Sequence, residues 1–149
     1  METDRHEKFT ILLVEDNSSH AELVMRSLGE HSISTAIFHV ADGEAALDYL
    51  FQRNQFADDS APRPHLVLLD LRLPKIDGLQ VLKEIRSSED LYRIPVVILS
   101  TSYAEIDVGK AYEHHANSYL VKPLDFEKFT NLMNDLGFYW LGWNHYPFS

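Results

Sequence analysis

His65-Leu66-Val67-Leu68-Leu69-Asp70 gives the clearest indication of the fold of this chain, because a short apolar run ends directly on a carboxylate. A run that is apolar at every position is typical of a strand buried on both faces, as in a parallel sheet with helices on each side. Four further runs have this character, although His39 interrupts one of them. They span residues 10–14, 36–40, 95–99 and 119–121. We therefore expect five strands in one parallel sheet.

Longer segments separate these runs and show the spacing of amphipathic helices. Apolar residues recur at i, i+3, i+4 and i+7 from Ala21 to Leu28, and Ser19 with Glu22 matches a capping box at the start of that helix. Further helical patterns follow the Asp42-Gly43 turn, follow Gly78, and cover residues 103–114 and 126–141. A strand followed by a helix, repeated five times, predicts a doubly wound α/β sheet with helices on both faces.

The polar stretch 52–64 interrupts this alternation. It contains Asp58-Asp59-Ser60 and Pro62-Arg63-Pro64, and we expect it to be an exposed loop. Loops of this length are uncommon in compact domains and are often functional. A tolerated surface insertion is the favoured interpretation, because added loop length costs little free energy.

Composition bounds the class of protein. The 149 residues suit one domain, with an extension at 1–8, a globular domain at 9–137 and an aromatic extension at 138–149. With 13 Lys and Arg against 23 Asp and Glu, the net charge is −10, which disfavours contact with nucleic-acid phosphates. The absence of cysteine excludes disulfides and thiolate chemistry. No apolar run reaches the ~20 residues of a membrane span and no signal peptide is evident, so we expect a cytoplasmic protein.

Polar residues follow the apolar runs at the carboxyl ends of the strands, where open α/β sheets bind their ligands. They are Glu15-Asp16 after the first run, Asp70 after the third, Ser100-Thr101 after the fourth and Lys122 after the fifth. Ser100 is favoured over Thr101 because it directly ends the apolar run. Clustered carboxylates favour a hard divalent cation such as Mg²⁺. Beside that cation, Asp70 could attack phosphorus and form an acyl phosphate, with Lys122 and the Ser100 hydroxyl neutralising the phosphoryl oxygens.

In this order and spacing, the motifs resemble those of the receiver domains of two-component response regulators, over about residues 9–136. The matching residues are Glu15-Asp16, Leu69-Asp70-Leu71-Arg72-Leu73-Pro74, Asp77-Gly78, Ser100 and Tyr119-Leu120-Val121-Lys122-Pro123. The resemblance implies a flavodoxin-like sheet with strand order 2-1-3-4-5. It also implies that a histidine kinase transfers a phosphoryl group to Asp70.

The same resemblance implies a metal site. Asp16, Asp70 and the Arg72 backbone carbonyl would ligate Mg²⁺ or Mn²⁺, with Ca²⁺ able to replace it in crystals, and Glu15 would contribute directly or through water. Glu15 stands where such domains more often have Asp, and its extra methylene should shift metal binding without abolishing it. The Arg72 side chain lies where it could hinder or guide the water that hydrolyses the acyl phosphate.

Three further residues have roles implied by the resemblance. Lys122 and Ser100 would contact the phosphoryl group, and Tyr119 matches the switch aromatic that turns inward when Ser100 moves. His115 stands where receiver domains often have glycine, and histidine can tolerate the left-handed backbone that such a position requires. The other histidines, among eight in the chain, are scattered and are interpreted as surface or packing residues.

A narrower resemblance connects the chain with the small regulators paired with cyanobacterial and other bacterial phytochromes. It rests on the 52–64 loop, on Leu99-Ser100-Thr101-Ser102 and on Phe138-Tyr139-Trp140-Leu141. It implies that the partner histidine kinase is a phytochrome.

The C-terminal segment is rich in aromatic residues. A stripe at helical spacing is expected to face the core and consists of Phe129, Leu132, Met133, Leu136 and Trp140. Trp143, Tyr146 and Phe148 lie beyond this stripe and would form an exposed apolar patch, which usually marks a partner surface. We therefore expect a homodimer through this tail and the fourth and fifth helical segments.

Three functions fit these features. The first is a single-domain regulator that accepts a phosphoryl group at Asp70, catalyses only its own phosphorylation and dephosphorylation, and signals through protein contacts. The second is a receiver-like module that binds a partner without phosphorylation, although it would not need Asp16, Asp70 and Lys122 together. The third is an enzyme or cofactor-binding protein. Arg72 stands where aspartyl phosphatases usually have a second Asp, and Glu15-Asp16 would repel the phosphate that a flavodoxin holds.

Overall fold

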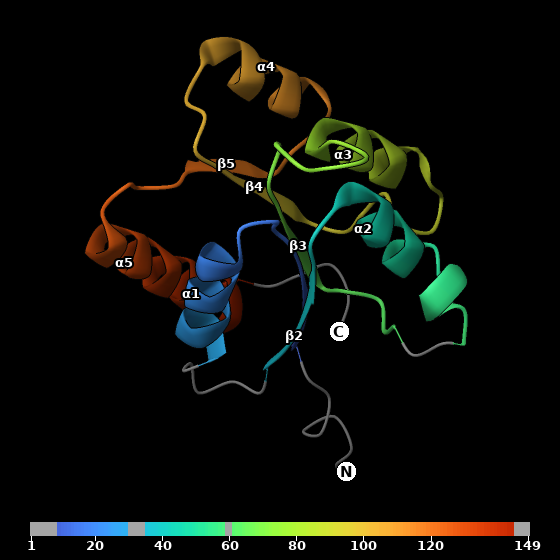
Figure 1. Cartoon of the computed structure of the whole chain (residues 1–149), viewed down its shortest axis with the longest axis horizontal. Coiled ribbons are helices and arrows are strands. Elements are labelled where there is room, and N and C mark those ends of the chain that lie inside the picture. Colours follow the sequence, from blue (N-terminus) through green and yellow to red (C-terminus); the bar gives the residue numbers. More distant parts are fainter. Residues whose placement is uncertain (1–8, 30–34, 59–60, 145–149) are drawn as a thin grey trace.

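The apolar runs form a parallel five-stranded sheet in the order β2-β1-β3-β4-β5 (Figure 1). The computed structural model describes residues 9–29, 35–58 and 61–144. The strands are β1 Phe9–Val14, β2 Thr35–Val40, β3 Leu66–Leu69, β4 Val96–Ser100 and β5 Ser118–Val121. The predicted strands and the predicted strand order are both confirmed.

The helices between the strands cover both faces of this sheet. In the described residues they are α1 Ser18–Gly29, α2 Gly43–Leu50, α3 Gly78–Ser87, α4 Glu105–Glu113 and α5 Phe126–Gly137. α1 packs against α5 on one face, and α2, α3 and α4 line the other (Figure 1). The chain winds outward from β1 to β2 and then returns to β3 on the other side of β1. This reversal opens a crevice at the carboxyl ends of the central strands.

Side chains of the central strands point alternately into two apolar cores. In β1, Ile11 and Leu13 pack with α1 and α5, whereas Leu12 and Val14 pack with α2 and α3. All four are buried. A strand between two helical layers has no solvent face, so an apolar residue is needed at every position. That is why these strands can be recognised from the sequence.

Side chains cap the starts of α1, α2, α3 and α5, whereas α4 follows Ala104 without a side-chain cap, and the prediction for α1 was wrong. The capping box expected from Ser19 and Glu22 does not form. α1 begins at Ser18, two residues before the start that a Ser19 cap would give, and the Asn17 side chain accepts the hydrogen bond of the His20 amide at 3.0 Å. Asn caps a helix as well as Ser does, and Glu22 is left to pair with Arg26 on the exposed surface.

Most described residues of the stretch 52–64 are exposed, as expected, but Ala61 and Pro64 are buried. Its described part contains the short 3₁₀ helix η2, Asn54–Phe56, and Ala61 is buried in the core. The Tyr49 hydroxyl donates to the Pro62 carbonyl at 2.8 Å, and the Tyr49 ring meets Phe56 edge-on. Tyr49 therefore anchors this loop to α2, because a buried phenol needs a hydrogen-bond partner.

The last helix continues past Gly137 as the π-helix η3, Phe138–Trp143. The predicted core-facing stripe is confirmed, since its members are buried or half-buried and all belong to or pack against one core cluster. The side chain of Trp143 and all of Tyr146 and Phe148 lie outside the described residues. Among the helices of the described ranges, none has the length and apolar character needed to cross a bilayer.

Candidate functional site

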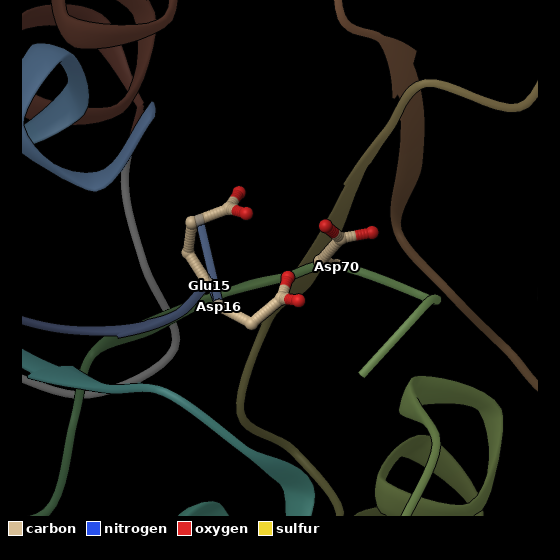
Figure 2. Close-up of side chains that lie close together, drawn as sticks. All are labelled: Glu15, Asp16 and Asp70. Carbon is tan, nitrogen blue, oxygen red and sulfur yellow. The ribbon is translucent and has the colours of Figure 1, made fainter. Parts of the chain in front are cut away.

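Three carboxylates meet at the carboxyl ends of β1 and β3. One carboxylate oxygen each from Glu15, Asp16 and Asp70 lies within 4.8 Å of the others (Figure 2). Glu15 and Asp70 are buried, whereas Asp16 is exposed. The strand register brings them together, because Val14 pairs with Leu69 and the Asp70 amide donates to the Val14 carbonyl at 3.1 Å. The predicted convergence of these acids is therefore present in the fold.

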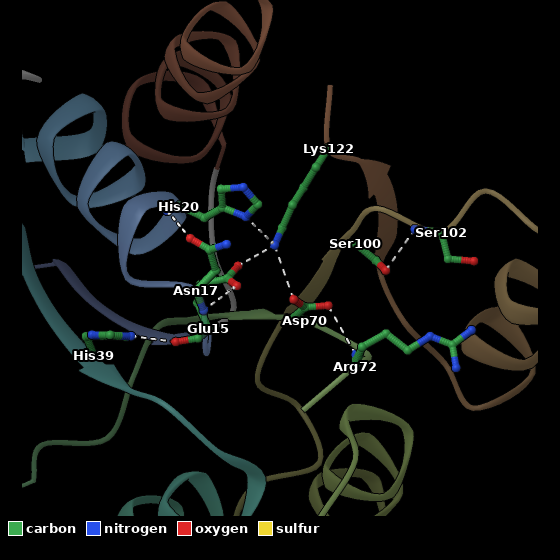
Figure 3. Close-up of polar contacts among 9 residues, drawn as sticks. All are labelled: Glu15, Asn17, His20, His39, Asp70, Arg72, Ser100, Ser102 and Lys122. Carbon is green, nitrogen blue, oxygen red and sulfur yellow. Dashed lines mark hydrogen bonds and ion pairs between the residues drawn. The ribbon is translucent and has the colours of Figure 1, made fainter. Parts of the chain in front are cut away.

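Lys122 supplies the cation that this cluster needs. Its Nζ lies 2.5 Å from Glu15 Oε1 and 3.1 Å from Asp70 Oδ2, and the residue is only 4% exposed (Figure 3). β5 is separated from β3 by β4, so the side chain must cross two strand spacings of about 4.8 Å each. Only a long cationic side chain can span that gap. A buried ammonium is tolerable here because two carboxylates compensate its lost hydration.

Burial raises the pKa of the Glu15 carboxyl above its ordinary value, and the hydrogen bond from Lys122 acts in the opposite direction. The Asn17 amide also donates to Glu15 Oε2, at 3.2 Å. The carboxylate form of Glu15 thus depends on a neighbouring cation. This is the electrostatic setting in which a divalent ion can be bound.

Ser100 and Tyr119 flank the carboxylates on the β4–β5 side. Ser100 is fully buried and Thr101 is exposed, so Ser100 is the hydroxyl at the end of the strand. Its Oγ accepts a hydrogen bond from the Ser102 amide at 3.2 Å. The half-buried Tyr119 turns toward the same loop, and its hydroxyl donates to the Ser102 carbonyl at 2.8 Å.

Arg72 lies beside Asp70, but its side chain leaves the site. The Arg72 amide donates to Asp70 Oδ1 at 3.1 Å (Figure 3), while the guanidinium pairs with Asp107 of α4 at 2.6 Å. The loop then returns very close to Asp70. A Cβ on Gly78 would lie 2.1 Å from the Asp70 carbonyl oxygen, so only glycine fits there.

Sequence reasoning missed His20. Its Nδ1 lies 3.2 Å from Lys122 Nζ, and its ring meets Phe129 of α5 edge-on. Burial, followed by the charge of Lys122, lowers the pKa of His20, which favours a neutral ring that accepts from the ammonium. The available signal was its place in the first turn of the helix that follows Glu15-Asp16.

Two other histidines have roles that involve the backbone. His115 has φ of 69°, the left-handed conformation expected from the sequence. His39 Nε2 lies 2.7 Å from the Glu15 carbonyl oxygen and so connects edge strand β2 to the start of the site. Hydrogen bonding to that carbonyl explains why a polar residue interrupts the apolar run.

This arrangement suits phosphoryl transfer with a divalent cation. The three acids offer only oxygen ligands, which hard divalent ions prefer. The buried Lys122 contacts Asp70, and the buried Ser100 hydroxyl lies at the neighbouring strand end, where both can neutralise phosphoryl oxygens.

Comparison with known proteins points to one protein family. Residues 11–134 match the response regulator receiver domain family. The chain is 48% identical to the probable methanogenesis regulatory protein FilR2 of Methanothrix harundinacea, over 97% of this chain and 91% of that protein. It is 42% identical to response regulator Rcp1 of Synechocystis sp., over 88% of each chain.

Solved structures agree with these relatives. The phosphorylated cyanobacterial phytochrome response regulator RcpA superposes with a TM-score of 0.91 at 38% identity, covering 95% of this chain and 100% of that one. The Mn²⁺-bound form of Rcp1 superposes with a TM-score of 0.89 at 40% identity, covering 93% of this chain and 99% of that one.

Proposed function

Because the chain belongs to the response regulator receiver domain family, we propose that it accepts a phosphoryl group on Asp70 from a histidine kinase. A carboxylate oxygen of Asp70 attacks the phosphorus of a phosphohistidine. The phosphorus–nitrogen bond breaks, and its electron pair leaves with the imidazole nitrogen, which takes up a proton. The observation that carries this proposal is the buried contact of Lys122 with both Asp70 and Glu15, which gathers acceptor, cation and acid at one point.

The residues around Asp70 fit a divalent cation, which we propose to be Mg²⁺, with Mn²⁺ as a substitute. Glu15, Asp16 and Asp70 would supply carboxylate oxygens, and the Arg72 backbone carbonyl would complete the protein's share. When bound, such an ion neutralises charge on the phosphoryl oxygens. The oxygen-only donor set supports this assignment, and the solved Rcp1 structure is a Mn²⁺-bound form.

Lys122 and Ser100 are proposed to contact the transferred phosphoryl group. Lys122 lies on Asp70 already, and its ammonium can turn to a phosphoryl oxygen once Glu15 has a second cation to bind. Ser100 is buried at the neighbouring strand end and accepts from the Ser102 amide, so its own hydrogen remains free to donate. Tyr119 is proposed as the switch residue, since its hydroxyl bonds the loop that follows Ser100.

Labelling with acetyl phosphate and Mg²⁺ tests this function. We expect a single alkali-labile phosphate on the unsubstituted chain and none on Asp70→Asn. Asp77→Asn is the matched control, because it removes the same charge from the same loop while keeping a cap acceptor for the Gln80 amide. Label that persists in Asp70→Asn would refute the assignment. An unlabelled wild-type chain would favour the phosphorylation-independent interaction module.

We also propose that the kinase partner is a phytochrome. The support is the similarity to Rcp1 and to the phytochrome response regulator RcpA. FilR2, at higher identity, is named for methanogenesis, so the test must include kinases of both kinds. Phosphotransfer from purified, prelabelled kinases should be fastest from a phytochrome, and preferential transfer from another kinase would reject the pairing.

A homodimer through α4, α5 and the C-terminal extension remains our proposal for signal output. Its support is the exposure of Ile106 and Tyr112 on α4. Light scattering should show a dimer of the fluoroberyllate-treated chain that Ile106→Glu weakens. Phe51→Glu, at an exposed position at the end of α2, is the control. A monomer in every condition would reject this interface.

A further inference from the structure

Asp107 joins the two loops that border Asp70. It belongs to the first turn of α4, and its Oδ2 accepts hydrogen bonds from Arg72 Nη2 and from Ser102 Oγ, both at 2.6 Å. The Asp107 side chain is 18% exposed, so most of it is covered. One carboxylate therefore bridges the β3–α3 loop, which carries Arg72, and the β4–α4 loop, which carries Ser102.

Ser102 connects this bridge to Ser100 and Tyr119, which are proposed to respond to phosphorylation of Asp70. While its hydroxyl donates to Asp107, its amide donates to Ser100 Oγ and its carbonyl accepts from the Tyr119 hydroxyl. A hydroxyl that accepts through its oxygen keeps its hydrogen available, so Ser100 can still donate to a phosphoryl oxygen. Ser102 therefore connects Asp107 directly to both Ser100 and Tyr119.

Arg72 connects the bridge to the other side of Asp70. Its amide donates to Asp70 Oδ1, and its guanidinium binds Asp107. The backbone of Arg72 therefore contacts the phosphoryl acceptor, and its side chain contacts α4. The pKa of Asp107 is lowered, chiefly by the Ser102 hydrogen bond and then by the charge of Arg72. Asp107 is therefore a carboxylate at neutral pH and can hold both partners.

We propose that Asp107 is a positioning residue for phosphorylation of Asp70. By binding Arg72 and Ser102 together, it arranges the two loops for phosphoryl transfer without touching the reacting atoms. This inference rests on the proposed function. Its physical basis is that both partners lie on loops, where loss of one contact permits displacements large enough to slow a reaction that depends on alignment.

Substitutions at Asp107 separate its two contacts. Asp107→Ala removes both, whereas Asp107→Asn keeps an oxygen that can accept from Ser102 and loses the charge that attracts Arg72. Glu105→Ala is the matched control, since it removes an exposed acid from the same helical turn. We expect the labelling rate constant with acetyl phosphate and Mg²⁺ to fall about three- to tenfold in Asp107→Ala, less in Asp107→Asn, and not in Glu105→Ala.

A double-mutant cycle distinguishes positioning from a merely structural role. Arg72→Ala and Asp107→Ala should slow labelling less in combination than the product of their separate effects, because each removes the same contact. Their urea unfolding midpoints should stay at the wild-type value. Equal labelling rates of Asp107→Ala and Glu105→Ala, or fully independent effects in the cycle, would overturn this inference but leave the proposed function standing. If wild type and Glu105→Ala take no label, the proposed function fails and the inference falls with it.

Discussion

The polar groups around Asp70 divide into an inner and an outer group that differ in origin and environment (Figure 3, which draws all members except Asp107). The inner group, Glu15, Asp70 and Lys122, is buried and follows directly on strands. The outer group, Arg72, Ser102 and Asp107, lies on two loops and a helix, and the Arg72 side chain is 69% exposed. Asp70 belongs to the first group and touches the second through the Arg72 amide.

The two groups therefore differ in rigidity. The inner group is positioned by strand register, and its charges interact with little screening by water. The outer contacts cross between loops near solvent, where salt and water weaken an ion pair. We therefore expect inner substitutions to change stability, and outer substitutions to change the rate of phosphorylation at nearly constant stability.

Removal of the inner cation should have the largest effect on stability. Lys122→Ala leaves the buried Glu15 and Asp70 without their shared cation, and we expect the free energy of unfolding to fall by about 3 kcal/mol in metal-free buffer. Urea denaturation measures this loss. Lys110→Ala, on the exposed surface of α4, is the control, and a comparable loss in both variants would contradict the comparison.

Addition of Mg²⁺ should stabilise the inner group by a smaller amount. At a free concentration tenfold above its dissociation constant, the ion should add about 1.4 kcal/mol to the free energy of unfolding. Asp16→Asn should remove most of this gain, because Asp16 is a proposed ligand. Asp77→Asn should retain it. Equal Mg²⁺ stabilisation of both variants would place the ion elsewhere.

Acidification tests His20, which lies at the edge of the inner group. Its pKa is lowered from 6.5, so below pH 6.5 the unfolded chain binds more protons than the folded one. Stability from His20 is therefore complete above that pH and is lost as the pH falls toward the folded pKa.

His20→Gln keeps a neutral acceptor for Lys122 and should flatten this loss. We would measure urea unfolding about one pH unit above and one below 6.5. The effect should be smaller than that of Mg²⁺, since solvent reaches part of the ring. His114→Gln, at the C-terminus of α4, should keep the wild-type dependence. A dependence that His20→Gln leaves unchanged would assign the acid loss to other groups.

Removal of the outer cation should affect stability least. Arg72→Ala breaks an exposed ion pair, and we expect its unfolding midpoint to match wild type within experimental scatter. Its labelling by acetyl phosphate should nevertheless slow. Destabilisation approaching that of Lys122→Ala would show that the two groups do not differ in the way proposed.

Much of the fold and the acidic cluster was predictable from local sequence. Each strand is an apolar run, and each polar residue at its end could be assigned to the same edge of the sheet. The choice of Ser100 over Thr101 followed from the same rule, and the burial of Ser100 agrees with it. The start of α1 was harder to predict, because Asn17 and Ser19 are both good caps and the path of the chain after β1 decides between them.

The outer group was not predictable in the same way. Nothing in the residue types of Arg72 and Asp107 distinguishes them from solvated surface charges. They lie 35 residues apart, and their contact depends on how α4 is placed over the β3–α3 loop. His20 was missed for a related reason, since its ring reaches Lys122 across 102 residues of chain.

By itself, the sequence determined the strands, their polar ends and the family to which the chain belongs. Those features depend on short-range patterns of apolar and polar residues, because a strand buried on both faces needs an apolar residue at every position. The groups that Lys122, His20 and Asp107 bind depend instead on the tertiary structure. These contacts join distant segments, and their geometry depends on strand register, helix placement and side-chain reach, none of which is contained in any local stretch of the chain.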